Sequence, residues 1–270
     1  MDEYRMTTYS TSTTSQTKTD HPTSYGMIIF PGFQALDVFG VLDVLNLLSA
    51  FQFKLSLSLI AATLDPVSTA SPIESGNPMG SNFHQSILPT HTFKTAPPLD
   101  VLIVPGGVGT RVPGNSLDEL RLFIKKRYPT VKYLITICTG AALAAQAGVL
   151  DGKKATTNKS AWKWAIAQGP KVNWVPVARW TVDGNVWTSS GVSAGIDAIL
   201  AFVGTVYGRP AVDTIVSQIE YDRHWDSTCD PWAMYHGVGC NIGKPNRKVE
   251  EKDNGYGYGM QSLGWWTSTK

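Results

Sequence analysis

The stretch YLITICTGAALAAQAGVL, residues 133–150, decides the fold. Its apolar and β-favouring residues through Ile137 predict a buried strand, and the small and apolar residues from Thr139 onward predict a helix. Cys138 stands at the corner between the two. A sharp strand–turn–helix presents its corner side chain above the sheet, as in a nucleophile elbow. The stretch therefore predicts an α/β protein with Cys138 at the edge where such sheets bind ligands.

Strands and helices alternate through the rest of the chain. We expect strands at 25–30, 53–63, 99–107, 132–137 and 153–158, helices at 35–50, 116–128, 139–147, 160–168, 193–208 and 209–222, and a hairpin at 178–191. This alternation predicts a mainly parallel sheet with helices on both faces. Ser116 and Glu119 form a capping-box pattern, and Ser193 is placed to cap the helix that follows it.

Composition excludes several classes of protein. The chain has 270 residues, of which 43% are hydrophobic and 16% charged, and its net charge is +2. No basic run supports nucleic-acid binding, and no apolar stretch is long enough to cross a membrane. The polar start lacks the apolar core of a signal peptide, so we expect a cytoplasmic protein. The scattered cysteines and histidines form no metal-ligand cluster, and no cofactor motif is present.

The two ends of the chain differ from the middle. Residues 1–24 are rich in Ser and Thr and poor in large aliphatic residues, which predicts a disordered tail. We expect the folded domain at 25–236. Residues 237–270 are rich in glycine and include Trp265 and Trp266. This second tail is either disordered or docked on its own domain or on a partner.

Two interpretations of Cys138 are open. At a helix start, unpaired amides and the helix dipole favour the thiolate, which is the nucleophilic form. We then expect Cys138 to be the most reactive of the three cysteines, ahead of Cys229 and Cys240. The alternative is a buried structural cysteine, which is common in protein cores.

Two further stretches lie near this corner in the predicted sheet. VPGGVGT (104–110) ends a strand with Gly106 and Gly107, whose amides are expected to point into the cleft and stabilise developing negative charge. A simple tight turn is the alternative. FPGFQALDVFG (30–40) places Asp37 among apolar residues, where its pKa is expected to rise so that it can shuttle protons. The alternative role for Asp37 is a helix cap.

Taken together, four stretches resemble one family. FPGFQALDVFG, DVLIVPGG, ITICTGAALAAQAGVLDGKKATTN and ARWTVDGNVWTSSGVSAGIDAIL are similar to the DJ-1/PfpI superfamily, and most of all to its isocyanide hydratase-like branch. The resemblance spans roughly residues 25–225. It implies a flavodoxin-like three-layer sandwich and a homodimer.

The resemblance also implies roles for single residues. Cys138 takes the nucleophile position and Asp37 the acid position. Thr139, Gln34, Gly106, Gly107 and Val108 fall near the pocket by the same mapping. In SSGVSAGIDAIL (189–200), a cap is a more common role for serine than catalysis, yet Ser190 and Gly191 lie on the same edge and are expected to contact the ligand.

The sequence departs from other branches of this family. Protease-like and glyoxalase-like members usually carry His after the cysteine, where this chain has Thr139, and a Glu where it offers Asp37. We therefore interpret the chain as a cofactor-free, cysteine-dependent hydratase that acts on a small uncharged molecule. Two alternatives remain: a related enzyme of secondary metabolism that uses the same pair, and a non-enzymatic redox sensor in which Cys138 oxidises reversibly.

Overall fold

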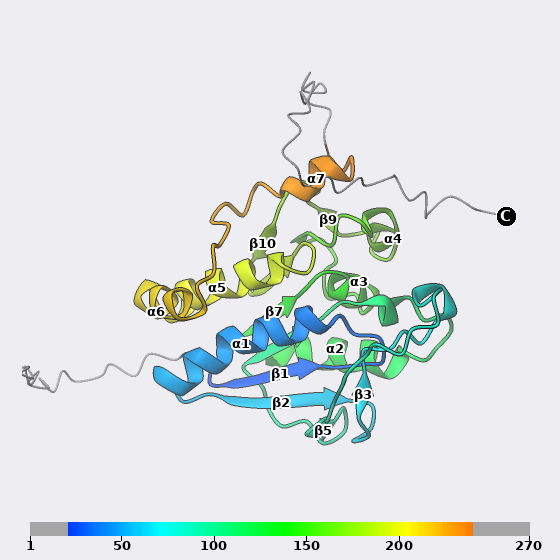
Figure 1. Ribbon diagram of the computed structural model, residues 1–270, viewed down its shortest axis with the longest axis horizontal. Helices are drawn as coiled ribbons and strands as arrows, with labels where there is room; N and C mark the ends of the chain where they lie inside the picture. Colours follow the sequence, from blue (N-terminus) through cyan, green and yellow to red (C-terminus); the bar gives the residue numbers. More distant parts are fainter. Residues whose placement is uncertain (1–20, 240–270) are drawn as a thin grey trace, which may run out of the picture. The chain divides into compact units, whose positions relative to one another are not determined.

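The computed structural model describes residues 21–239, and its centre is a seven-stranded sheet. In sheet order the strands are β10 (Trp180–Asp183), β11 (Val186–Ser189), β7 (Tyr133–Thr136), β6 (Val101–Val104), β1 (Ser24–Ile28), β2 (Ser56–Ala61) and β5 (His91–Thr92). All neighbours are parallel except β10 and β11, which form the expected hairpin. Figure 1 shows β1 and β2 running side by side.

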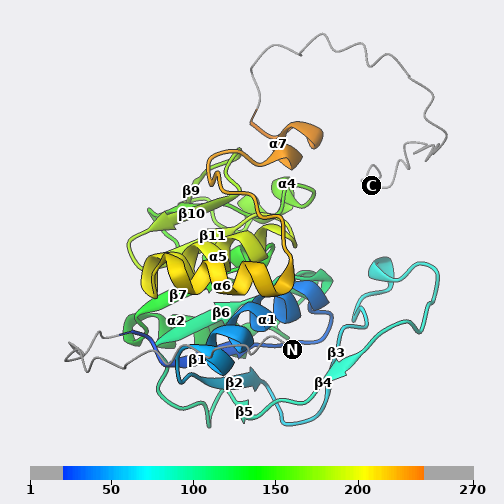
Figure 2. The ribbon, with the colours of Figure 1, turned by 60° about the vertical axis from the view of Figure 1, so that its left-hand side comes forward.

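Helices flank this sheet, as the alternating pattern predicted. On one face α1 (Ala35–Phe51), α5 (Ala194–Val206) and α6 (Arg209–Ile219) pack against one another, and they lie in front of the sheet in Figure 2. α2 (Asp118–Arg127) packs against α3 (Gly140–Gln146). β6 reads VLIV and is buried along its whole length, as expected of a central strand covered on both sides. No helix within residues 21–239 is long and apolar enough to span a bilayer.

Smaller elements complete the described part of the chain. They are the strand pairs β3 (Val67–Ser68) with β4 (Ser86–Ile87) and β8 (Lys154–Ala155) with β9 (Asn173–Trp174), the helices α4 (Trp162–Ala167) and α7 (Pro231–Tyr235), and the 3-10 turns η1 (Glu74–Gly76), η2 (Val108–Arg111) and η3 (Tyr128–Thr130). The strand expected at 153–158 is thus only two residues long and pairs outside the main sheet. α7 lies near β9 and α4 in both views (Figures 1 and 2).

Both predicted serine caps are wrong. α2 begins at Asp118, and the residue before it, Leu117, makes no side-chain capping hydrogen bond. Ser193 does precede α5, but its backbone is already helical and its hydroxyl caps nothing. A capping serine needs an extended backbone to turn its hydroxyl back toward the free amides, and Ser193 lacks that conformation.

The folded unit extends slightly beyond the expected domain bounds. Near its start, the Thr23 amide donates a 2.7 Å hydrogen bond to Asp100 and the His21 ring stacks on Tyr207. Near its end, Val238 is buried and its amide donates to the carbonyl of Ala233. The remaining parts of the two predicted tails, with Cys240, Trp265 and Trp266, lie outside the described residues.

Candidate functional site

The topology brings four loops to one edge of the sheet. β11, β7, β6 and β1 are parallel neighbours, so their carboxyl ends coincide. The segments that leave this edge carry Ser190, Cys138 and Gly106, and Asp37 follows β1 in the first turn of α1. This edge is where open α/β sheets bind ligands.

Cys138 occupies a sharp elbow between β7 and α3. Its φ of 55° is unusual for a residue with a side chain, and neighbouring loops hold it there. The Cys138 amide donates a 3.1 Å bond to the carbonyl of Ser190, and its own carbonyl accepts a 2.9 Å bond from the Thr157 hydroxyl. The turn needs glycine at position 140, because a Cβ there would lie 2.1 Å from the carbonyl oxygen of Val104.

Asp37 is fully buried, and its carboxylate binds the loop beside the elbow and does not cap its own helix. The capping position of α1 is Gln34 and not Asp37. Oδ2 of Asp37 accepts a 2.8 Å hydrogen bond from the amide of Gly106. Its Oδ1 has no well-formed hydrogen bond among the described residues. Burial raises the pKa of Asp37 to about 7, while the Gly106 amide and the nearby Cys138 thiol oppose that rise. The carboxyl is therefore poised to gain or lose a proton near neutral pH.

The expectation that the elbow stabilises a thiolate is wrong. Burial, and then the negative charge of Asp37, raise the pKa of the Cys138 thiol well above its usual range. The Thr139 amide and the side chains of Asn158 and Thr139 lower that pKa, but they do not outweigh burial. Desolvation outweighs the helix terminus here, because the Cys138 thiol is only 5% exposed. The exposed Cys229 is the more accessible thiol.

The double glycine also differs from its expected role. The Gly106 amide is bound to Asp37, and the Gly107 amide donates a 3.0 Å bond to Oγ1 of Thr139. The Thr110 hydroxyl donates to that same Oγ1 at 3.2 Å. These amides position the acid and the residue after the thiol, so they are not free donors aimed into the cleft. The physical reason is that the α1 and α3 termini approach the turn closely enough to take both bonds.

The expected substrate-binding residues fall beside two separate cavities. Ser190 and Gly191 line a cavity of about 230 Å³, which we call the Ser190 cavity. Gln34 and Val108 line a second cavity, of about 300 Å³, which we call the Gln34 cavity. The structure thus brings Cys138, Asp37, Thr139, Gly106 and Gly107 into direct contact. Ser190 and Gln34 join this group through backbone hydrogen bonds to Cys138 and Gly106 and also line the two cavities, whereas Gly191 and Val108 lie in the cavity linings.

A comparison with known proteins now identifies the family. The model of the DJ-1/PfpI family matches residues 25–205. The chain belongs to the DJ-1/PfpI family. The family and the α/β fold expected from the sequence are therefore confirmed.

Relatives of this DJ-1/PfpI chain differ in their described roles. An isonitrile hydratase of Pseudomonas putida is 34% identical over 199 residues, which cover 73% of this chain and 77% of that protein. The HTH-type transcriptional regulator GbdR of Pseudomonas aeruginosa is 24% identical over 220 residues, covering 81% of this chain and 55% of the regulator. The crystal structure of a ThiJ/PfpI family protein from Pseudomonas syringae has a TM-score of 0.62 and 28% identity, covering 75% of this chain and 76% of that chain.

Sequence reasoning missed two polar residues near the thiol. The side chain of Asn158 interacts with the Cys138 thiol and also lines the Ser190 cavity. The Arg111 guanidinium stacks over Trp164 at 5.1 Å, and burial lowers the pKa of Arg111, an effect that the nearby Cys138 opposes. Asn158 ends the strand expected at 153–158, but that strand pairs outside the main sheet, so the expected strand did not place this side chain beside the thiol. Arg111 had no usable signal, since only the η2 turn brings it back toward the elbow.

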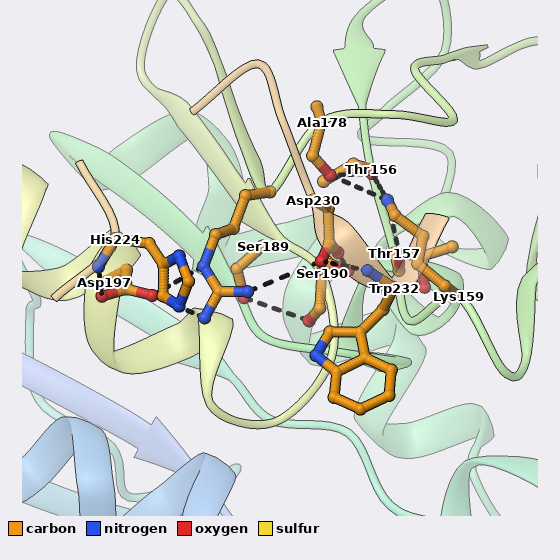
Figure 3. Close-up of polar contacts among 11 residues, drawn as sticks. Thr156, Thr157, Lys159, Ala178, Ser189, Ser190, Asp197, His224, Asp230 and Trp232 are labelled. Carbon is orange, nitrogen blue, oxygen red and sulfur yellow. Dashed lines mark hydrogen bonds and ion pairs between the residues drawn. The ribbon is translucent and has the colours of Figure 1, made fainter. Parts of the chain in front are cut away.

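A buried charged cluster, also missed, forms part of the lining of the Ser190 cavity through Arg179. Arg179 is 2% exposed and pairs with Asp197 at 2.6 Å and with Asp230 at 3.5 Å. The Ser190 hydroxyl donates to Asp230, and Figure 3 shows these two residues between Asp197 and Lys159. Among residues 21–239, no group of three or more His, Cys, Asp or Glu side chains could hold a metal ion.

Proposed function

We propose that this chain is a hydratase that converts small uncharged isonitriles to N-substituted formamides, with Cys138 as nucleophile and Asp37 as proton carrier. The observation that carries the proposal is the coupled pair itself: a buried thiol and a buried carboxyl that each alter the pKa of the other. Such a pair can hold one proton between two sites and move it during a reaction. The 34% identity to an isonitrile hydratase supports this choice of substrate.

In the first step the thiol adds to the terminal carbon of the isonitrile. Asp37, with a pKa of about 7, accepts the thiol proton as sulfur attacks, and then delivers it to that same carbon. The carbon gains one bond to sulfur and one to hydrogen, which gives a thioimidate, R–N=CH–S–Cys138. Asp37 is again a carboxylate at the end of this step.

In the second step water replaces sulfur. The Asp37 carboxylate takes one proton from the water as the oxygen adds to the carbon, and it passes that proton to the nitrogen, which gives R–NH–CH(OH)–S–Cys138. Asp37 then takes the hydroxyl proton as this adduct collapses to R–NH–CHO and expels the thiolate, and it returns that second proton to sulfur. The Thr139 amide and the Asn158 side chain, which favour the charged form of Cys138, stabilise the departing thiolate.

The site features argue against the redox-sensor alternative. Peroxide reacts with thiolates on accessible, low-pKa cysteines. The Cys138 thiol is buried and its pKa is raised, so general oxidants meet the neutral form. A substrate that accepts the thiol proton through Asp37 avoids this difficulty, because proton loss and attack happen together.

The test supplies a small aryl or alkyl isonitrile and follows formamide by NMR. A parallel assay measures lactate from methylglyoxal, and a third titrates the protein with peroxide before intact-mass analysis. We expect formamide with the intact chain and none with Cys138→Ala. Lactate without formamide would replace the proposal with glyoxalase chemistry. Rapid oxidation of Cys138 without either product would favour the sensor.

A further inference from the structure

The chain after α6 folds back over the candidate site. Residues 223–239, which we call the C-terminal segment, include α7. The Arg179 amide donates a 2.8 Å bond to the carbonyl of Ser227, and the Asp230 amide donates a 2.8 Å bond to the carbonyl of Val177. These bonds hold the segment against the loop that leads into β10. No local sequence pattern predicts this position.

Asp230 anchors this segment inside the charged cluster. Its carboxylate is 1% exposed, faces Arg179 at 3.5 Å and accepts from the Ser190 hydroxyl. The same carboxylate caps α7 by accepting a 3.2 Å bond from the Trp232 amide. Lys159 lies on the other side, where burial lowers the pKa of its ammonium to about 8 and the Asp230 charge opposes that fall. A buried carboxylate with these partners is costly to release, because it would leave Arg179 and Ser190 without a partner.

One residue joins this anchor to the candidate nucleophile. Ser190 donates its hydroxyl to Asp230, and its carbonyl accepts from the Cys138 amide. The Ser190 amide donates 2.8 Å to the carbonyl of Arg179. Asp230 therefore binds the side chain of Ser190, and Cys138 binds its backbone carbonyl. Movement of the C-terminal segment would reach the elbow through Ser190.

The segment also supplies one side of the Ser190 cavity. Trp232 and His236 of the segment line it together with Asn158 and Val192. Figure 3 shows the Trp232 ring projecting from the segment that carries Asp230. Asn158 interacts with the Cys138 thiol, so a group attached to the sulfur has this cavity next to it.

We propose that the C-terminal segment determines substrate size: Trp232 and His236 form the outer wall of the subsite for the substituent R, and Asp230 is the positioning residue that holds this wall in place. Trp232 and Val192 give this cavity apolar surface. Of the two cations that also line it, Arg179 is paired with two carboxylates, and the Lys159 ammonium donates its hydrogen bonds to protein oxygens. The substituent that fits is therefore uncharged, with an apolar or aromatic part. The identity of R–NC as substrate rests on the proposed function. The wall itself does not, since it can be measured through Cys138 alone.

The experiment compares alkylation of Cys138 by iodoacetamide and by the bulkier N-benzyl iodoacetamide. It uses the full chain with Cys229→Ser and Cys240→Ser, so that Cys138 is the one remaining thiol. Trp232→Ala should raise the rate of the bulky reagent relative to the small one by about tenfold, the scale of pocket-size discrimination. Trp232→Phe should give a smaller shift in the same direction.

Two aromatic residues outside this wall serve as matched controls. Trp225 belongs to the same segment but stacks on Arg223 at 4.0 Å, and Phe83 lines the Gln34 cavity instead. Neither Trp225→Ala nor Phe83→Ala should change the ratio of the two rates. A shift with Phe83→Ala and none with Trp232→Ala would place R in the Gln34 cavity and overturn the proposal.

Asp230→Asn tests the anchor, because it keeps the size and the capping oxygen but removes the charge. We expect faster hydrogen exchange of the amides at 231–238 and a change of the alkylation ratio in the same direction as Trp232→Ala. Ser190→Ala removes one bond to Asp230, leaves the ion pair with Arg179, and should give the same changes in weaker form. Unchanged exchange and an unchanged ratio in both variants would refute the positioning role.

The two proposals fail in different ways. No formamide from the intact chain, together with the shifted alkylation ratio in Trp232→Ala, would reject the hydratase and keep the wall. Formamide with an unshifted ratio would keep the hydratase and reject the wall. In the case where both hold, Trp232→Ala should also raise kcat/KM for isonitriles with bulky R relative to methyl isonitrile.

Discussion

The amide of Gly106 donates a 2.8 Å hydrogen bond to Oδ2 of Asp37. This bond joins the loop after β6 to the first turn of α1, so two segments distant in sequence fix the acid of the candidate site. A Cβ at position 106 would lie 2.5 Å from the Thr139 amide nitrogen and 3.0 Å from Asp37 Oδ2. Only glycine lets all three groups meet.

Gly106→Ala should therefore separate Asp37 from the elbow. We expect a loss of stability of about 1–3 kcal/mol, as for other overpacked sites. The rate of hydration should fall on the order of tenfold or more, because a misplaced proton carrier is inefficient. Urea unfolding and steady-state kinetics measure the two effects. Gly114→Ala is the control for rate: its Cβ meets nothing within 4 Å, and its φ of 80° strains an alanine, so this variant loses stability without touching the site. Full activity in Gly106→Ala would show that this contact is dispensable.

Cys138→Ala should abolish formamide production and leave the fold intact. The thiol is buried but only its sulfur is removed, so the free energy of unfolding should change by no more than about 1–2 kcal/mol. Circular dichroism and thermal melting check the fold, and NMR checks the product. Cys229→Ser is the matched control at an exposed cysteine and should keep full activity. Residual turnover in Cys138→Ala would rule out a covalent intermediate on this residue.

Asp37→Asn should lower the rate by about 10²-fold or more, the usual contribution of a general acid–base. The pKa of Asp37 is about 7, and the carboxylate is the form that accepts the thiol proton. In the unmodified chain kcat/KM should therefore rise as the pH increases through about 7. Asp37→Asn should show no such rise of kcat/KM with pH. The same rise in both proteins would assign this titration to another group.

The same substitution should make the protein more stable at alkaline pH. The raised pKa of Asp37 means that the folded chain binds its proton more tightly than the unfolded chain does. The stability from that proton is present below about pH 4 and is lost as the pH rises through about 7. Asp37→Asn lacks this loss, worth on the order of 1–4 kcal/mol. Urea midpoints at pH 5 and pH 8 measure it, and equal pH slopes in both proteins would contradict it.

The chain should form a homodimer through the outer face of α1. Leu36 and Phe39 of α1 and Leu57 of β2 are large apolar residues, each about two-fifths exposed, and they line one shallow depression. Light scattering should give twice the monomer mass of 29.3 kDa. Phe39→Glu should give the monomer, whereas Leu122→Glu on α2 should not change the mass. A monomer in the unmodified chain would refute this interface.

The arrangement of the strands and the corner position of Cys138 follow from local sequence. Apolar runs of strand length alternate with helical spacing, and parallel strands then place their carboxyl ends together. Two further residues could be recognised from local sequence. Gly140 follows Cys138 in a sharp turn, where the backbone geometry requires glycine, and Asp37 stands out as an acid among apolar neighbours.

Properties that depend on distant contacts required the tertiary structure. The pKa of Cys138 is raised, whereas the sequence predicted that it would be lowered. Desolvation outweighs the helix terminus, and no local pattern shows how deeply a side chain is buried. The amides of Gly106 and Gly107 bind Asp37 and Thr139 because three loops meet there. The return of Asp230 to Arg179, 51 positions earlier in the chain, is set by packing and by the pairing of buried charge. Sequence patterns describe a residue's neighbours along the chain, whereas burial and charge pairing depend on neighbours in space.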